Sequence, residues 1–168
     1  LTLGIALLAR GWYEADELTH FLKAREVWRD PREILDIWGR PACTGLYALI
    51  APAGLAAARV LAALVTGLVA WGTVRLAREL LATAEGETAG MPSLFRRHAT
   101  AWLCLLLFAQ PMFLFNSAAV MTEMMLACCW VWAAVLLVRQ RVLGASVLLG
   151  LGGLARPEGW FAIGVWPV

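Results

Sequence analysis

Charged side chains are scarce in this chain. Asp, Glu, Lys and Arg together make up only 15% of the 168 residues, whereas 61% are hydrophobic, well above the roughly 45–50% apolar usage of soluble domains. The charges cluster between apolar runs, and the nine Trp and six Phe fit interfacial belts and helix packing in lipid. This composition excludes an ordinary soluble domain and predicts an all-α, polytopic membrane protein.

The chain also lacks the patterns of a nucleic-acid-binding or metal-binding protein. Its net charge is only +2, and no basic stripe with interleaved aromatics occurs, so no nucleic acid partner is expected. Its four cysteines, which are Cys43, Cys104, Cys128 and Cys129, show no ligand spacing, and three of them lie in apolar runs. We interpret them as small buried hydrophobic side chains, in preference to metal or redox sites.

No initiator Met and no charged segment precede the apolar residues 1–9, so these residues do not resemble a signal peptide. They are also too few to cross a bilayer, since a crossing helix needs about 20 residues. At the other end, Trp166-Pro167-Val168 lies within another apolar run. We expect residues 1–168 to be the N-terminal part of one multi-pass membrane domain, truncated at both ends.

The polar segment from Arg10 to Arg40 follows residues 1–9, which are expected to form the outer half of a first membrane helix. Asp16 is predicted to cap a helix in this segment, with Glu17 in its first turn and Asp30-Pro31 ending it. Its apolar residues recur at helical spacing, namely Leu18, Phe21, Leu22 and Trp28. We therefore expect an amphipathic helix that lies along the membrane surface.

Apolar segments fill most of the remaining chain. Pro52 and Gly54 divide residues 42–80 into a short interfacial or re-entrant piece and a crossing helix over residues 55–74. A polar loop is expected over residues 84–93, ending in Arg96-Arg97-His98. Residues 99–115 and 118–138 are then predicted to form an antiparallel pair joined at Asn116-Ser117. A tight turn at Arg139-Gln140-Arg141 leads into residues 142–154, which start back across.

Charge orients this topology. The loops on one side carry six arginines against three glutamates, a net charge of +3, so the remaining segments sum to −1 because the whole chain is +2. The positive-inside rule places the positive side in the cytoplasm. The segment from Arg10 to Arg40 is then extracytoplasmic, in a plasma or inner membrane protein.

Three carboxylates stand at the predicted membrane mouth, namely Glu14, Asp16 and Glu17, close to Trp12 and Tyr13. Such a cluster could take a proton from an acceptor hydroxyl or bind a divalent cation at Asp16 and Glu17. The alternative is a solvated loop end with an ordinary helix cap.

Four more charged residues lie inside or near apolar segments. Glu123 is expected about one turn inside its span, where an unpaired carboxylate is costly, unless it reaches interfacial water. Arg156 and Glu158 follow a helix too short to cross, which predicts a recessed charged pair with either a functional or a structural role. Arg59 either extends to the interface or contacts the phosphate of a lipid head group.

Several short motifs resemble the GT-C glycosyltransferase superfamily. They are Glu14-Ala15-Asp16-Glu17 after a first membrane helix, the amphipathic loop helix, Gly39-Arg40-Pro41, the Ala-rich run from Leu55, Met121-Thr122-Glu123, and residues 154–159. Some members have His-Pro before the acidic pair where this chain has Glu14-Ala15, so the subfamily stays open and includes the mannosyltransferase branch.

The resemblance implies a polytopic enzyme that transfers a sugar from a polyprenyl phosphate to an extracytoplasmic acceptor. It matches Asp16 and Glu17 to the family's acidic motif, and we predict Asp16 as general base, with Glu17 assisting it or binding a metal. Substrate contacts are predicted for Glu14, Arg59, Glu123, Arg156 and Glu158. A transporter or flippase of lipid-linked substrates and a membrane scaffold subunit remain alternatives.

Overall fold

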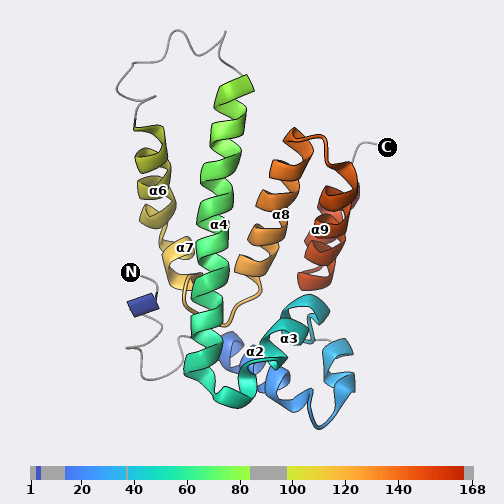
Figure 1. The fold of residues 1–168 in the computed structure, drawn as a ribbon. Helices are drawn as coiled ribbons and strands as arrows, with labels where there is room; N and C mark the ends of the chain where they lie inside the picture. Colours follow the sequence, from blue (N-terminus) through green and yellow to red (C-terminus); the bar gives the residue numbers. More distant parts are fainter. Residues whose placement is uncertain (1–2, 5–13, 37, 84–97, 165–168) are drawn as a thin grey trace.

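The computed structural model describes residues 3–4, 14–36, 38–83 and 98–164 (Figure 1). All regular secondary structure within these ranges is helical, so the predicted all-α class is confirmed. The elements are α2 (Ala15–Glu26), η1 (Pro31–Leu35), α3 (Pro41–Ala48), η2 (Ala51–Ala53), α4 (Leu55–Thr83), α6 (Ala99–Ala109), α7 (Pro111–Asn116), α8 (Glu123–Val138), α9 (Val142–Ala155) and α10 (Gly159–Gly164). The predictions for residues 1–9, 84–93 and 166–168 lie outside the described residues, apart from residues 3–4.

The long helix α4 forms the axis of the fold. Figure 1 shows α8 along one side of α4 with α9 beyond it, and α6 on the other side of α4. Helices α2 and α3 lie across one end, against α9 and the beginning of α4. This end, which we call the α2 end, also contains the start of α8 and the end of α9.

At the opposite end of the bundle α4 ends, α6 begins and α8 turns into α9. Glu79 of α4 accepts hydrogen bonds there from Arg139 Nε at 3.1 Å and from Arg75 Nε at 3.1 Å. Gln140 takes a left-handed conformation, with φ 59°, at the tight turn predicted for residues 139–141. We call this the arginine end, and it carries Arg75, Arg78 and Arg139.

The predicted division of residues 42–80 is confirmed, but the helix predicted over residues 55–74 continues to Thr83. Gly54 has a φ of 100°, a conformation that L side chains rarely adopt, and it separates α3 and η2 from α4. The helix over residues 142–154 is also observed, one residue longer, as α9.

Pro111 breaks the helix that we predicted over residues 99–115. Gln110 is extended, as expected before a proline, and Pro111 starts the separate helix α7. Residues 99–115 and 118–138 run in opposite directions as predicted, but α6 and α8 each pack mainly on α4 instead of on each other.

The predicted span over residues 118–138 begins later than expected. Residues 117–122 form a buried non-helical segment, and α8 starts only at Glu123. The side chains compete with helical hydrogen bonding here, because Ser117 Oγ donates to the Leu114 carbonyl and Thr66 Oγ1 donates to the Ser117 carbonyl. Glu123 therefore lies at the helix start and not one turn inside it.

Helix α2 begins before Asp16 and buries a different face from the one predicted. Its N-cap is Glu14, without a side-chain capping bond, so the prediction that Asp16 caps the helix is wrong. Glu17, Phe21 and Ala24 are buried, at the spacing of one helix face, whereas Leu22 is exposed. The helix also ends at Glu26, before Asp30, whose side chain instead accepts a bond from the backbone N–H of Arg32 at the start of η1.

One helix in the described part of the chain has the length and apolar character needed to cross a membrane, namely residues Leu55–Ala82 of α4. The other strongly apolar helices, α6, α8 and α9, have 11, 16 and 14 residues, fewer than the roughly 20 that cross a bilayer.

Candidate functional site

The predicted acidic cluster separates into exposed and buried members. Glu14 and Asp16 are exposed, whereas Glu17 is completely buried. Consecutive residues of an α-helix point about 100° apart, because one turn takes about 3.6 residues. Asp16 and Glu17 therefore face different surroundings, and the sequence motif does not bring their carboxylates to one point.

Glu17 forms a two-point ion pair with Arg59 of α4. Arg59 Nε donates to Glu17 Oε1 at 2.8 Å, and Arg59 Nη2 donates to Oε2 at 2.6 Å. Only 2% of the Arg59 side chain and none of the Glu17 side chain is exposed. Glu17 Oε1 also accepts the backbone N–H of Val120 at 3.3 Å. Arg59 thus neither extends to the membrane interface nor lies open to a ligand.

The recessed charges predicted near the ends of α8 and α9 form a three-residue network. Arg156 donates from Nε and Nη2 to the two carboxylate oxygens of Glu158, at 3.1 and 3.0 Å, and from Nη1 to Glu123. These hydrogen bonds lower the pKa of Glu158 to about 2. The network is partly open to solvent, since 25% of the Arg156 side chain and 51% of the Glu158 side chain are exposed.

His20 of α2 lies within electrostatic range of this network. The side chain is partly buried, and its Nδ1 atom has no hydrogen-bond partner in the described part of the chain. Burial lowers the pKa of His20 below its usual 6.5, the nearby carboxylates of Asp16 and Glu123 oppose this shift, and the cations Arg40 and Arg156 add to it. Charged groups from four segments therefore act electrostatically on one imidazole.

Two of these groups, His20 and Arg40, were not among the residues predicted from the sequence to form the site. His20 had a local signal, because it follows Asp16 by four residues and so lies on the same helix face. Arg40 has a weaker sequence signal, because its position depends on the close approach of the Gly39 backbone to the preceding turn. A Cβ on Gly39 would lie 2.6 Å from the carbonyl oxygens of Glu33 and Ile34, so only glycine fits there.

The structure brings together most of the predicted site residues. Arg156 contacts both Glu123 and Glu158, and the charges of Glu123, Arg156 and Asp16 act on His20. Arg59 and Glu17 form a separate pair, and Glu14 makes no side-chain capping bond at the start of α2. We refer to Asp16, His20, Arg40, Glu123, Arg156 and Glu158 as the polar cluster.

The divalent cation predicted at Asp16 and Glu17 does not fit this geometry. Both oxygens of Glu17 bind the Arg59 guanidinium, and Asp16 points away from them. Within the described ranges, no three His, Cys, Asp or Glu side chains converge as ligands of a metal ion.

An apolar groove of about 660 Å³ lies within the helix bundle. Its walls come from α3, α4, α8 and α9, and they include Pro41, Leu46, Leu68, Met125, Trp132 and Leu148. Pro41 directly follows Arg40 in the sequence and Met125 lies two residues after Glu123 on α8, but the residues that line the groove include none of the six residues of the polar cluster. Cys128 and Cys129 line it as free thiols. Cys43, also free, is buried in α3, where burial raises the pKa of its thiol to about 12.

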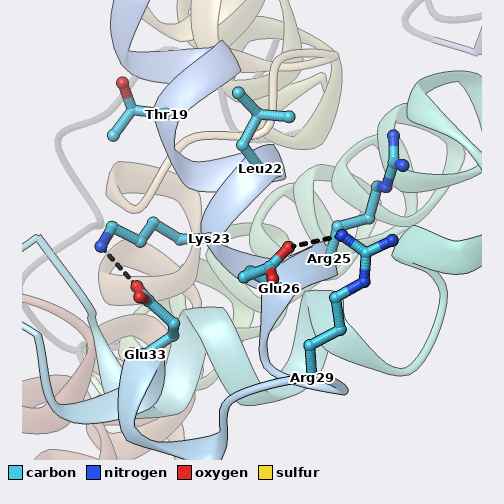
Figure 2. A pocket seen from close by; sticks show the side chains of 7 residues that line it. All are labelled: Thr19, Leu22, Lys23, Arg25, Glu26, Arg29 and Glu33. Atoms are coloured by element: carbon cyan, nitrogen blue, oxygen red, sulfur yellow. Dashed lines mark hydrogen bonds and ion pairs between the residues drawn. The ribbon is translucent and has the colours of Figure 1, made fainter.

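A second, polar cleft of about 520 Å³ lies on the outward side of α2, and Figure 2 shows the seven side chains that line it. Its charges are largely paired with one another. Lys23 bonds to Glu33 and lies 3.2 Å from Asp36, and Arg29 lies 3.4 Å from Glu26. The hydrogen bond to Glu33 raises the pKa of Lys23. The Lys23–Glu33 pair holds η1 against α2, and the pairing of these charges leaves the polar cluster as the stronger candidate site.

Comparisons of the chain with protein-family models, with curated proteins and with solved structures find no significant match. The resemblance to GT-C glycosyltransferases therefore stays a prediction from the short motifs quoted above.

Proposed function

We propose that this chain is part of a multi-pass membrane glycosyltransferase that moves a sugar, with mannose the first candidate, from a polyprenyl phosphate to an extracytoplasmic acceptor. The observations that carry the proposal are the polar cluster, centred on Arg156, and an apolar groove whose walls include Pro41 and Met125, near Arg40 and Glu123 in the sequence. An amphiphile with an anionic phosphate and a long hydrocarbon chain needs both surfaces side by side. Sugar transfer needs a base next to them.

Exposed apolar side chains support the membrane setting. Large hydrophobic residues point outward along three helices, and they include Leu64, Leu68 and Trp71 of α4, Leu105 and Leu106 of α6, and Leu143, Val147 and Leu151 of α9. Exposed apolar surface of this extent is typical of contact with lipid or with a partner.

The chemistry assigns different tasks to the members of the cluster. Asp16 is exposed in the first turn of α2 and is proposed to take the proton from the acceptor hydroxyl. The hydroxyl oxygen then bonds to the anomeric carbon of the sugar, and the bond to the donor phosphate breaks with its electron pair on the leaving polyprenyl phosphate. Arg156 is proposed to stabilise that anion, because its planar guanidinium suits phosphate oxygens.

Arg156 already holds Glu158, so a donor phosphate must compete with that carboxylate. Glu158 is half-exposed and follows the end of α9, where it can turn toward solvent. In this scheme Glu158 occupies the phosphate position until the donor arrives, and Glu123 keeps Arg156 oriented.

The activity test uses the full-length protein in detergent with a polyprenyl-phosphate sugar whose sugar carries a radioactive label. Asp16→Asn should lower turnover by about 10²–10⁴-fold, the usual contribution of a general base, and should change donor affinity much less. Near-normal transfer by this variant would reject Asp16 as the base. Movement of the labelled lipid between leaflets without any transfer would favour the transporter alternative.

The topology test labels single cysteines on whole cells with an impermeant thiol reagent. A cysteine placed within residues 14–36, at the α2 end, should react, and one placed within residues 84–98 should not. The reason is the charge difference between the two sides, which puts the arginine end in the cytoplasm. The reverse labelling pattern would remove the polar cluster from the proposed active face.

A further inference from the structure

We infer that Glu17 and Arg59 are positioning residues of the polar cluster, which fix the rotation of α2 so that Asp16 and His20 face Glu123 and Arg156. This inference rests on the proposed function for its catalytic consequence but has a structural readout of its own. It also gives Glu17 a role different from the assisting or metal-binding one that the motif predicts.

The geometry of α2 supports this inference. Measured around the helix axis, Asp16 lies about 100° to one side of Glu17, and His20 lies about 60° to the same side. Asp16 and His20 therefore share a face, whereas Glu17 occupies the adjacent face that packs against α4. Two hydrogen bonds to the planar fork of Arg59 fix the Glu17 carboxylate in direction as well as distance. A rotation of α2 that moves Asp16 and His20 away from the cluster breaks both bonds.

Glu17 also contacts the segment that precedes Glu123. Residues 117–122 are buried without being helical, so their backbone polar groups need partners from elsewhere. Glu17 supplies one of these partners by accepting the Val120 N–H at 3.3 Å, and Thr66 of α4 donates to the Ser117 carbonyl at 2.9 Å. Val120 lies three residues before Glu123. The same carboxylate therefore contacts α4 and the segment that leads directly into the other half of the cluster.

Glu17 and Arg59 carry opposite charges that bind each other directly, whereas the pKa of His20 responds to the charges of Asp16, Glu123, Arg40 and Arg156. Arg59→Lys keeps both charges of the pair, so a change in the ionisation of His20 in that variant reports a movement of α2 or of the start of α8.

The experiment uses the full-length protein and two substitutions that keep side-chain size close to the original. Glu17→Gln removes the charge of the pair, and Arg59→Lys keeps the charge but loses the planar fork. Glu26→Gln is the matched control, because it makes the same chemical change on the same helix, outside the polar cluster. The structural readout is the rate at which diethyl pyrocarbonate modifies His20 as a function of pH, followed by mass spectrometry of the peptide that contains His20.

We expect both substitutions to move the midpoint of His20 modification toward pH 6.5, the usual value for histidine, because the imidazole becomes better hydrated when α2 turns. We also expect kcat to fall by about 10–100-fold, since misplacement of catalytic groups by about 1 Å has effects of this size, with the KM for the donor little changed. Glu26→Gln should leave both the midpoint and kcat unchanged.

Folded Glu17→Gln and Arg59→Lys proteins with the parent midpoint and the parent kcat would overturn the inference. Loss of the fold in both variants would also overturn it, because the pair would then stabilise the fold as a whole. A shifted midpoint in a protein that transfers no sugar would support the positioning role and reject the proposed function. Sugar transfer that is lost in Asp16→Asn but normal in Glu17→Gln and Arg59→Lys would support the proposed function and reject the positioning role.

Discussion

The α2 end contains two arginine-centred ion-pair systems with opposite exposure. Arg59 is 2% exposed and binds one carboxylate at two points, whereas Arg156 is 25% exposed and binds two carboxylates. Both use the guanidinium fork, and both join segments far apart in the sequence. The buried Arg59–Glu17 contact holds α2 in place, whereas the more exposed Arg156–Glu158 contact can be entered by a ligand.

Burial also determines how much free energy is lost when one partner of each ion pair is removed. A buried charge that loses its partner keeps the full desolvation penalty, while a partly exposed one is rehydrated. Arg59 has no route to water, but Glu158 can leave Arg156 and be solvated. Truncation of one partner should therefore lower stability most in the first system, whereas in the second it should mainly change ligand binding.

The largest effect is expected at the buried pair. Arg59→Ala leaves Glu17 as an unpaired buried carboxylate and should lower the free energy of unfolding by about 3–5 kcal/mol, measured by thermal denaturation in detergent. Replacing both residues with Leu should recover part of this loss, because no uncompensated charge remains. Arg25→Ala, at an exposed position of α2, serves as control and should change stability by less than about 0.5 kcal/mol. Equal losses for Arg59→Ala and Arg25→Ala would erase the distinction between the two systems.

An intermediate effect is expected at the open network. Arg156→Lys keeps the charge but cannot offer two parallel N–H groups, so the Kd for a polyprenyl phosphate should rise about tenfold to a hundredfold, as charge-assisted hydrogen bonds contribute about 1.5–3 kcal/mol. Titration of the purified protein with the lipid phosphate measures this change. The matched control is Arg139→Lys, which alters a partly exposed Arg–Glu pair at the arginine end and should leave the Kd unchanged. Unchanged binding by both variants would show that the donor phosphate lies elsewhere.

The smallest effect is expected from His20, which is only partly buried. Its pKa in the folded chain is lowered from 6.5, chiefly by burial. As the pH falls through 6.5, the unfolded chain binds a proton before the folded chain does, so stability decreases until the lower folded pKa is passed. Denaturation midpoints measured between pH 7.5 and pH 5 should therefore fall less in His20→Gln than in the parent protein. Equal pH dependence in the two proteins would mean that His20 titrates as it does in the unfolded chain.

Much of the fold could be predicted from local sequence signals. Gly54 and Pro52 mark the start of α4, and Arg139-Gln140-Arg141 marks the turn before α9, because glycine, proline and polar residues interrupt apolar runs in a position-specific way. Pro111 carried an equally clear signal that the prediction over residues 99–115 did not use. The non-helical path of residues 117–122 could not be predicted, since it depends on Thr66 and Glu17, which come from distant segments.

The sequence predicted which residues form the candidate site better than it predicted which of them bind one another. Charges close to apolar segments identify Glu123, Arg156 and Glu158 as residues that need partners. In the structure Arg156 binds both carboxylates. No local pattern joins Glu17 to Arg59 across 42 positions. The acidic motif treats Asp16 and Glu17 as equivalent neighbours, but the helix turns one carboxylate outward and the other toward α4.

Helix α4 carries an ionic anchor near each of its ends. Arg59 binds Glu17 at the α2 end, and Glu79 binds Arg139 at the arginine end. The 20 residues from one anchor to the other rise about 30 Å in an α-helix, which equals the hydrocarbon thickness of a typical bilayer. In the membrane arrangement proposed above, the two ion pairs on α4 are therefore separated by one bilayer thickness, so each lies near a different face of the membrane. Adding one residue between Arg59 and Glu79 would rotate one ion pair by about 100° around the helix axis relative to the other. The length of this helix is therefore as constrained as its composition.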